Sequence, residues 1–206
     1  MNREPILIDL PEELIGERVI VRAYRPGDGA AVYEAVTSCR DDLVRWLPWA
    51  ETYGSLDDSE ALIRRFDAKW RLREDLTAGV WHRETGQYLG GTGLHRIDWN
   101  VRKFEVGYWL RSDAVGKGYM SEAVTLLCDM AFGPLEANRV FIRCASDNIR
   151  SAAIPKRLGF RHEGTHHNDG VRSDGELFDM EVFGITADEW RSAKTALTVA
   201  GKSAGA

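Results

Sequence analysis

The stretch of residues 103–132 constrains this chain most, because a strand, a glycine turn and an amphipathic helix follow one another there without a spare residue. Its first eight residues alternate β-branched and aromatic side chains with others, which is typical of a strand. The turn contains Gly116 and Gly118, and the helix that begins near Tyr119 repeats apolar residues at three- and four-residue steps until a Gly-Pro pair. Such a turn gathers backbone N–H groups at the positive end of a helix, and Lys117 adds a charge. The pattern therefore predicts a phosphate-binding site.

A glycine turn between a strand and a helix is also often no more than a tight connection, so the ligand must be identified by something else. The turn differs from the two best-known nucleotide loops. Ser121 stands where G-x-G-x-x-G needs its third glycine, and the chain contains no G-x-x-x-x-G-K-[ST]. A Rossmann dinucleotide site and a P-loop are both disfavoured.

Composition excludes several classes of protein. A chain of 206 residues with 44% hydrophobic residues is long enough for one domain with a substantial core, and its net charge of -5 argues against a dedicated nucleic-acid binder. The chain has neither a signal segment at its start nor an apolar run of membrane-spanning length, so we expect a cytoplasmic protein without a membrane partner. Cys39, Cys128 and Cys144 occur singly in apolar segments and predict buried thiols. His166 and His167 lack a third ligand, so we expect no metal.

Periodicity and turn residues predict a mixed α and β fold in the order β, two helices, three strands, helix, strand, helix, two strands and a last helix. The expected strands are residues 17–23, 77–82, 88–94, 103–110, 139–145, 161–166 and 177–184. The expected helices are residues 29–38 with Asp28 as N-cap, 60–74 capped from 55–59, the helix after the glycine turn, 148–158, and one from 187. Residues 199–206 are small and polar, and we expect a disordered tail.

This order of elements, together with four motifs, resembles the Gcn5-related N-acetyltransferase superfamily over residues 17–185. These are Trp46-Leu47-Pro48-Trp49, Glu105-Val106-Gly107-Tyr108-Trp109-Leu110, Gly116-Lys117-Gly118-Tyr119-Met120-Ser121-Glu122-Ala123, and Asp147-Asn148…Ser151…Leu158-Gly159-Phe160. Within the superfamily they are similar to the ribosomal-protein N-terminal acetyltransferases of the RimJ/RimL type. The resemblance implies an α+β fold, with a mostly antiparallel sheet splayed between its fourth and fifth strands and helices on both faces. It also implies one acetyltransferase domain over residues 1–198.

The resemblance implies acetyl-CoA as the donor, with its pantetheine between the splayed strands. We picture these as diverging antiparallel strands whose unpaired N–H and C=O groups the pantetheine satisfies. An N–H near Trp109 would polarise the thioester carbonyl, although an indole on a central strand also often belongs to the core. The family pattern has Gln or Arg three positions before the first glycine, and here Asp113 stands there. The implied cofactor-binding residues are Trp109, Leu110, Arg111, Val115, Gly116, Lys117, Gly118, Tyr119, Met120, Asn148 and Ser151.

Acetyl transfer to an amine needs a neutral amine, a stabilised oxyanion and a proton for the departing thiolate. Ser151 matches the family position proposed to supply that proton, or it only caps a helix. Many members use a tyrosine four residues before the Gly-Phe pair, but this chain has Pro155 there and so lacks that phenol. A proline inside the helix is also expected to kink it. Glu105 is the first candidate for the base, with an ion pair as the alternative. Further candidates are Asp169, Glu176 and His95.

Trp46 and Trp49 are the candidate residues that bind the acceptor, and nearby acids could attract a cation or form a solvated face, namely Asp41, Asp42, Glu51, Asp57 and Asp58. An α-amine with a pKa near 8 is about a tenth neutral at pH 7, whereas a lysine amine is almost fully charged. A site without a strong base therefore fits N-terminal α-amine acetylation, for example of a ribosomal protein. The alternatives are acetylation of an aminoglycoside or polyamine, or a catalytically silent acyl-CoA sensor. A homodimer is a possible assembly.

Overall fold

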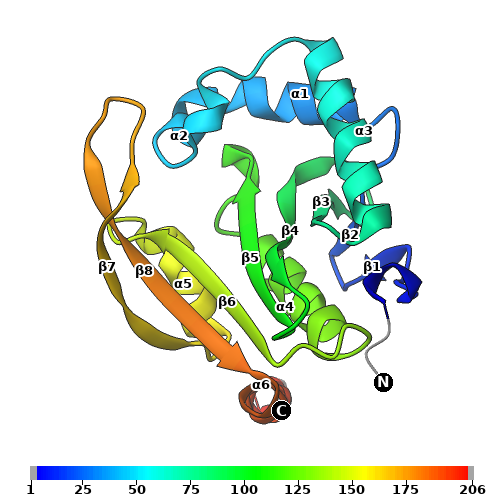
Figure 1. Ribbon diagram of the computed structural model, residues 1–206, viewed down its shortest axis with the longest axis vertical. Helices are drawn as coiled ribbons and strands as arrows, with labels where there is room; N and C mark the ends of the chain where they lie inside the picture. Colours follow the sequence, from blue (N-terminus) through cyan, green and yellow to red (C-terminus); the bar gives the residue numbers. More distant parts are fainter. Residues whose placement is uncertain (1–3, 204–206) are drawn as a thin grey trace.

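The computed structural model describes residues 4–203, with side chains as far as residue 195. An eight-stranded sheet forms its centre, in the order β1-β2-β3-β4-β5-β6-β8-β7 (Figure 1). The strands are β1 (Glu13–Ile15), β2 (Val19–Ala23), β3 (Leu76–His82), β4 (Tyr88–Asp98), β5 (Lys103–Leu110), β6 (Arg139–Ala145), β7 (Arg161–Val171) and β8 (Leu177–Thr186). The helices are α1 (Gly29–Ser38), α2 (Arg40–Val44), α3 (Leu56–Leu72), α4 (Tyr119–Phe132), α5 (Ile149–Arg157) and α6 (Ala187–Ser203).

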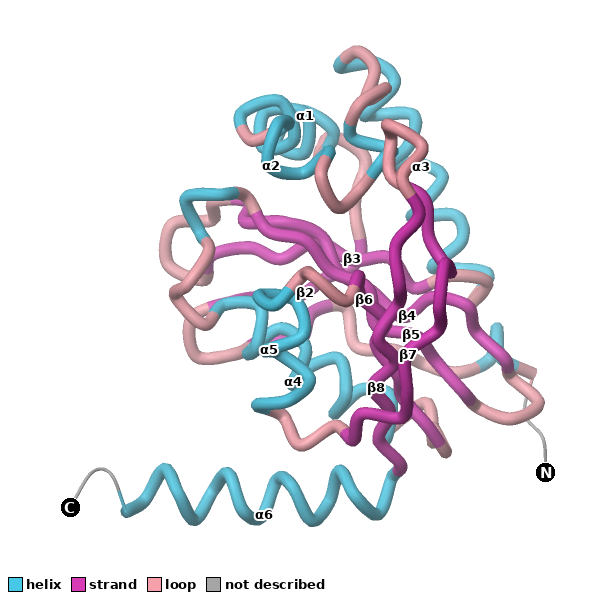
Figure 2. The backbone as a smooth tube through the Cα atoms, turned by 90° about the vertical axis from the view of Figure 1, so that its left-hand side faces the viewer, coloured by secondary structure: helices cyan, strands magenta, loops and turns pink. Residues whose placement is uncertain are grey.

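Helices cover both faces of the sheet, as the sequence predicts (Figures 1 and 2). Alternate side chains of the central strands, such as Val80 and Phe104, are fully buried against α4, whose own apolar face includes Leu127. The other face of the same strands carries a second cluster of buried residues beneath α1 and α3. Side chains that alternate along one strand therefore belong to two different layers.

The splay that the sequence predicts lies between β5 and β6. Their pairing runs from Lys103 opposite Arg139 only as far as Glu105 opposite Phe141, while both strands continue. The expectation that the diverging strands are antiparallel is wrong, because this pair is parallel. A parallel pair needs a crossover of a dozen or more residues, and α4 supplies it. The other pairs of neighbouring strands in the described sheet are antiparallel.

Several element boundaries differ from the expected ones. β1 was not expected, and β4, β7 and β8 continue beyond their predicted ends. α3 begins four residues early, at Leu56, because Ser55 and Asp58 form a reciprocal capping box. Asp28 stands at the N-cap of α1 but makes no side-chain cap bond. Its carboxylate instead binds the guanidinium of Arg22 of β2 at 2.7 Å, so β2 takes the group that was expected to cap the helix.

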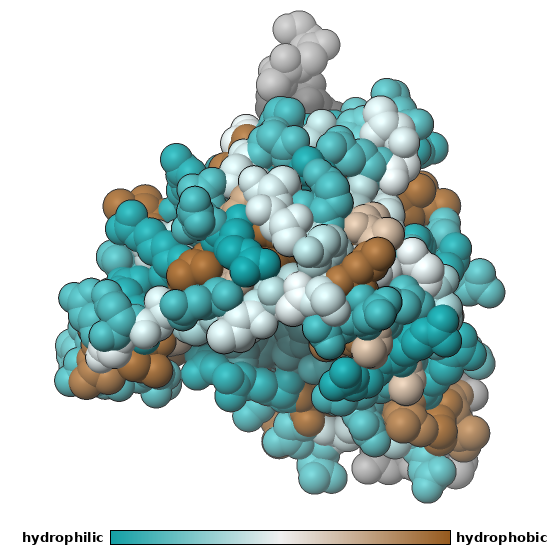
Figure 3. All heavy atoms as spheres, turned by 90° about the horizontal axis from the view of Figure 1, so that it is seen from above, coloured by the Kyte–Doolittle hydropathy of each residue, from teal (hydrophilic) through white to brown (hydrophobic). Residues whose placement is uncertain are grey.

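α1 and α3 pack against each other and together cover one face of the sheet (Figure 1). The contact is close at Gly29, where a Cβ would come within 2.7 Å of the Cα of Glu60. The Glu60 carboxylate accepts from the backbone N–H groups of Gly27 and Gly29, which ties the start of α1 to α3. Seen from above, the surface is largely hydrophilic with isolated apolar side chains (Figure 3).

The end of the described chain is helical. Trp190 of α6 donates to Asp129 of α4 at 3.0 Å and stacks on Phe132. α6 continues to Ser203, so residues 199–203 are helical where the sequence predicts disorder, and residues 204–206 lie outside the described residues. Over the described range, no helix combines the length and apolar character needed to cross a bilayer. The three cysteines are free and buried, as predicted.

Candidate functional site

The glycine turn before α4 has the backbone that only glycine adopts easily. Gly116 and Gly118 both have left-handed φ angles, of 82° and 81°, and Gly118 is the N-cap of α4. A Cβ at Gly116 would meet no atom within 4 Å, whereas a Cβ at Gly118 would lie 3.2 Å from the guanidinium of Arg18. The turn therefore has free space next to Gly116 and is contacted by Arg18 at Gly118. It lies at the positive end of the dipole of a fourteen-residue helix.

Arg18 and Glu122 hold this turn against the start of β2. Arg18 donates from its backbone N–H to Glu122 Oε1 at 2.7 Å, from Nε to Oε2 at 2.9 Å, and from Nη1 to the carbonyl oxygen of Lys117 at 2.9 Å. Burial alone would raise the pKa of the Glu122 carboxyl, but these donors and the N–H of Val19 lower it. The carboxylate is therefore ionised at neutral pH, and the turn is fixed before any ligand arrives.

The diverging ends of β5 and β6 leave a gap between the two strands. At this gap, hydrogen bonds from two hydroxyl groups join the start of α5 to β5. The Tyr108 hydroxyl donates to the backbone oxygen of Ser151 at 2.9 Å, and Ser151 Oγ donates to the Tyr108 hydroxyl at 3.3 Å. Pro155 has no N–H to give to the Ser151 oxygen, so the phenol takes the place of that helical hydrogen bond. Asn148 accepts from the Ser151 N–H at 3.0 Å and caps α5, as expected of one of its two roles.

Tyr108 is the residue at this position that sequence reasoning missed. The absence of a tyrosine at position 155 suggested that no phenol is available, but β5 brings one to Ser151 from the other side of the gap. Burial raises the pKa of the Tyr108 hydroxyl, which therefore stays protonated at neutral pH. Strand alternation could have indicated it, because Tyr108 must face away from its neighbours Gly107 and Trp109.

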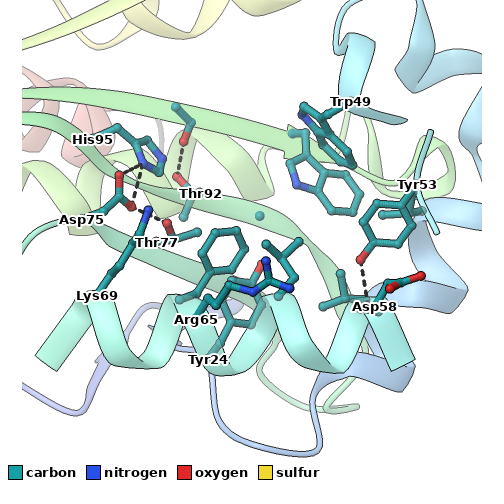
Figure 4. Close-up of a pocket in the computed structure, with 18 of the residues that line it drawn as sticks. Tyr24, Trp49, Tyr53, Asp58, Arg65, Lys69, Asp75, Thr77, Thr92 and His95 are labelled. Atoms are coloured by element: carbon teal, nitrogen blue, oxygen red, sulfur yellow. Dashed lines mark hydrogen bonds and ion pairs between the residues drawn. The ribbon is translucent and has the colours of Figure 1, made fainter. Parts of the chain in front are cut away.

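Gly107 and Trp109 face a cavity of about 530 Å³ on the opposite side of β5. The cavity lies between the sheet and α3, and Figure 4 shows its two ends. At one end are Trp49, Tyr53 and Asp58, and at the other are Lys69, Asp75, Thr77 and His95, with Tyr24 and Arg65 between them. Its volume is within the range of binding sites for small ligands.

Aromatic side chains form the wall next to Trp109. Its indole packs edge to face against Trp49 and Tyr88, with ring centroids 6.0 and 5.9 Å away. Trp109 thus belongs to the cluster under α1 and α3, and also to the lining of the cavity. Trp49 lines the cavity as a predicted acceptor residue should, with 42% of its surface exposed. Trp46 lies outside the lining residues, because its ring packs against the guanidinium groups of Arg45 and Arg172.

Glu105 occupies an ion-pair network rather than the cavity. Its carboxylate lies 2.8 Å from Arg96 Nε and 3.2 Å from Arg143 Nε, and Arg143 also approaches Asp169 at 3.4 Å. Two guanidinium groups therefore flank the carboxylate. This is the ion pair that the sequence left open as the alternative to a base. Glu176, a further candidate base, lies 3.5 Å from Arg172.

Arg111, at the end of β5, is also held by carboxylates. Its guanidinium contacts Glu34 of α1 at 2.9 Å and Asp113 at 2.7 Å, and its side chain is 11% exposed. Asp113, which stands where the family pattern has Gln or Arg, therefore pairs with Arg111. The side chain of Arg111 links β5 to α1, and its backbone N–H donates to Leu89 of β4.

Comparison with known proteins decides the family. The family model described as Acetyltransferase (GNAT) domain matches residues 18–161. The chain belongs to the GNAT family. A Bacillus subtilis (strain 168) protein described as "Putative ribosomal N-acetyltransferase YdaF" is 32% identical over 181 residues, which are 87% of this chain and 97% of that protein.

Solved structures agree with this assignment. A crystal structure described as a "Probable acetyltransferase" is 30% identical with a TM-score of 0.80, covering 85% of this chain and 96% of that one. RimL, described as a ribosomal L7/L12 alpha-N-protein acetyltransferase in complex with coenzyme A, has the same fold at 19% identity. Its TM-score is 0.81, and the match covers 86% of this chain and 99% of that one.

This GNAT protein is therefore an N-acetyltransferase that uses acetyl-CoA as its donor. Its own residues fit the donor at two places. The open, left-handed turn at Gly116 and Gly118 suits a pyrophosphate, and the widening gap between β5 and β6 beyond Glu105 suits an extended pantetheine.

Proposed function

We propose that this acetyltransferase modifies the N-terminal α-amine of a protein, such as a ribosomal protein. The observation that carries the proposal is that residues 107–109 of β5 alternately face the two sides of the sheet. Gly107 and Trp109 line the cavity, while Tyr108 between them contacts Ser151 in the gap. An acceptor that enters the cavity reaches the same strand segment as the donor, from the opposite face. The description of the relative YdaF as a ribosomal N-acetyltransferase supports the same class of acceptor.

The charges around the cavity favour a singly charged acceptor. Among the charged lining residues, Asp58 and Asp75 are offset by Arg65 and Lys69. A polyamine or an aminoglycoside carries several positive charges and would meet both cations. A peptide brings one ammonium group followed by neutral backbone, which suits a mixed polar and aromatic wall. Of the acids that the sequence suggested as attractants, Asp58 lines the cavity, and Asp42 is bonded to Ser112.

The same geometry supports a proposal for the donor site and for the acid. We propose that residues 115–120, Asn148 and the backbone of residues 109–111 bind acetyl-CoA, which supplies the acetyl group as a reactive thioester. Ser151 would give its hydroxyl proton to the departing sulfur and recover one through the Tyr108 hydroxyl, 3.3 Å away. A backbone N–H near Trp109 would stabilise the developing oxyanion. A homodimer stays a prediction, which sedimentation of the purified chain tests.

The experiment uses one peptide that carries both a free α-amine and a lysine. We expect mass spectrometry to place the acetyl group on the α-amine, because that amine is more often neutral at pH 7. Trp49→Ala should raise KM more than it lowers kcat, since Trp49 borders the cavity, and Trp46→Ala should change KM less.

Other outcomes separate the alternatives. Acetylation of lysine alone, or activity restricted to aminoglycosides or polyamines, would contradict an N-terminal acceptor and leave the acetyltransferase activity intact. A rise in Tm with acetyl-CoA but no thiol release with any amine would support a silent sensor.

A further inference from the structure

His95 and Asp75 form a hydrogen-bonded pair at one end of the cavity, and we infer that they are the general base for the acceptor amine. The inference rests on the proposed function only in requiring that an amine enters this cavity. Neither residue belongs to the ion-pair network of Glu105, the carboxylate that the sequence favoured.

The imidazole of His95 lies over two glycines of the sheet. A Cβ at Gly107 would come within 2.9 Å of its Cδ2 and 3.2 Å of its Nε2, and a Cβ at Gly93 within 2.9 Å of its Cε1. The ring therefore occupies space that exists because both residues lack a side chain. Gly107 is next to Tyr108, so the ring lies against the strand segment whose other face carries Tyr108, the hydrogen-bond partner of the proposed proton donor Ser151.

Asp75 orients the ring. His95 Nδ1 lies 3.0 Å from both carboxylate oxygens of Asp75, and the Thr77 hydroxyl donates to the same carboxylate. Burial alone would raise the pKa of Asp75, but the hydrogen bonds from His95 and Thr77 lower it, so the carboxylate is ionised at neutral pH. An ionised acceptor at Nδ1 places the ring proton there and leaves the Nε2 lone pair available. Figure 4 shows His95 and Asp75 together at one end of the cavity.

Other charged groups, on α3 and β5, lie along the cavity or next to the pair, and none replaces it as the base. Lys69 and Arg65 of α3 are cations, and Lys69 adds to the stabilisation of ionised Asp75. Glu105 is opposite His95 in the β4–β5 register, but Arg96 and Arg143 hold its carboxylate. Asp58 lies at the far end of the cavity, where Ser55 donates to it.

The proposed reaction moves one proton from the acceptor to His95 and one from Ser151 to the leaving sulfur. Nε2 of His95 takes one N–H proton from the ammonium group of the acceptor, and the freed nitrogen lone pair forms the bond to the acetyl carbon. The carbon–sulfur bond breaks, and its electron pair leaves with sulfur, which takes the proton from Ser151. The second amine proton is lost as the amide forms and reprotonates Ser151 through the Tyr108 hydroxyl, while His95 releases its proton to water, which returns both side chains to their starting states.

The test measures kcat/KM against pH with the preferred amine, whichever class that is. With a peptide α-amine we expect His95→Gln to lower kcat/KM about 10²-fold at pH 7, the scale of a positioned base. The deficit should shrink above pH 8, because an α-amine then loses its proton without help. Asp75→Asn should give a similar but smaller pH-dependent loss.

His167→Gln is the matched control, because His167 also pairs with an aspartate through Nδ1, at 3.0 Å from Asp179, but is 81% exposed and outside the lining residues of the cavity. We expect it to leave the profile unchanged. A His95→Gln deficit that is equal at every pH would show a structural role and overturn the inference.

A second measurement needs neither donor nor turnover. Nitrogen-15 NMR of the wild-type protein should show the proton of neutral His95 on Nδ1, and Asp75→Asn should change the tautomer balance. A proton on Nε2 at neutral pH would overturn the inference even if His95→Gln fails to fold. A lysine or polyamine preference with the same His95-dependent profile would contradict the N-terminal acceptor while leaving the base in place.

Discussion

A single missing N–H group explains how Tyr108 and Ser151 come together. Proline at position 155 leaves the carbonyl oxygen of Ser151 without its helical donor, and a buried carbonyl without a partner is costly. The Tyr108 hydroxyl satisfies that oxygen and brings its own oxygen close to Ser151 Oγ. The sequence predicted Ser151 and the proline, but the pairing depends on where β5 lies relative to α5, which local patterns do not encode.

The Ser151–Tyr108 pair leads to a prediction about turnover. Ser151→Ala should lower kcat about 10²-fold and leave the Kd for acetyl-CoA nearly unchanged, since the backbone N–H that Asn148 caps is kept. Tyr108→Phe should lower kcat about tenfold, because it removes both hydrogen bonds to Ser151 but leaves the serine hydroxyl in place. Steady-state kinetics and calorimetry check the two quantities separately. An unaltered kcat in Ser151→Ala would assign the proton to water.

At the scale of elements, the strand, turn and helix over residues 103–132 were predictable because each is encoded locally. Alternation, two glycines and a helical repeat all lie within thirty residues, and β5 and α4 have nearly the expected bounds. The support behind the turn was not predictable. Arg18 and Glu122 are 104 residues apart in sequence, and only the packing of β2 against α4 joins them.

The turn gives a prediction about donor affinity. Gly118→Val should weaken acetyl-CoA binding at least tenfold, because valine resists a φ of 81° and its Cβ would press on Arg18. Lys117→Ala should weaken it less than about fivefold, since it removes one solvent-screened charge. Gly116→Ala, at a φ of 82° but with no atom within 4 Å of the new Cβ, measures the backbone strain without the contact. Equal losses by calorimetry in Gly118→Val and Lys117→Ala would argue against binding by backbone amides.

At the scale of the whole molecule, β5 separates the proposed donor site from the proposed acceptor site. The donor site would be the gap between β5 and β6, and the acceptor site would be the cavity beneath α1 and α3 (Figures 1 and 4). The order of elements and their resemblance to a family predicted the gap. They did not predict the cavity, because its lining comes from α1, α3, β3, β4 and β5 and includes glycines on separate strands, namely Gly91 and Gly107. Trp46 and Trp49 also show this limit, since two tryptophans three residues apart in one motif have different partners.

We propose that donor and acceptor meet at β5 from opposite faces. A crystal structure with a conjugate of coenzyme A joined to a peptide N-terminus tests it most directly. We predict that the pantetheine lies between β5 and β6 and that the peptide follows the cavity past Trp109 and Trp49, with its first nitrogen beside His95. A peptide that instead leaves along the groove lined by Arg45, Asp147 and Arg172, with the cavity empty, would contradict the claim.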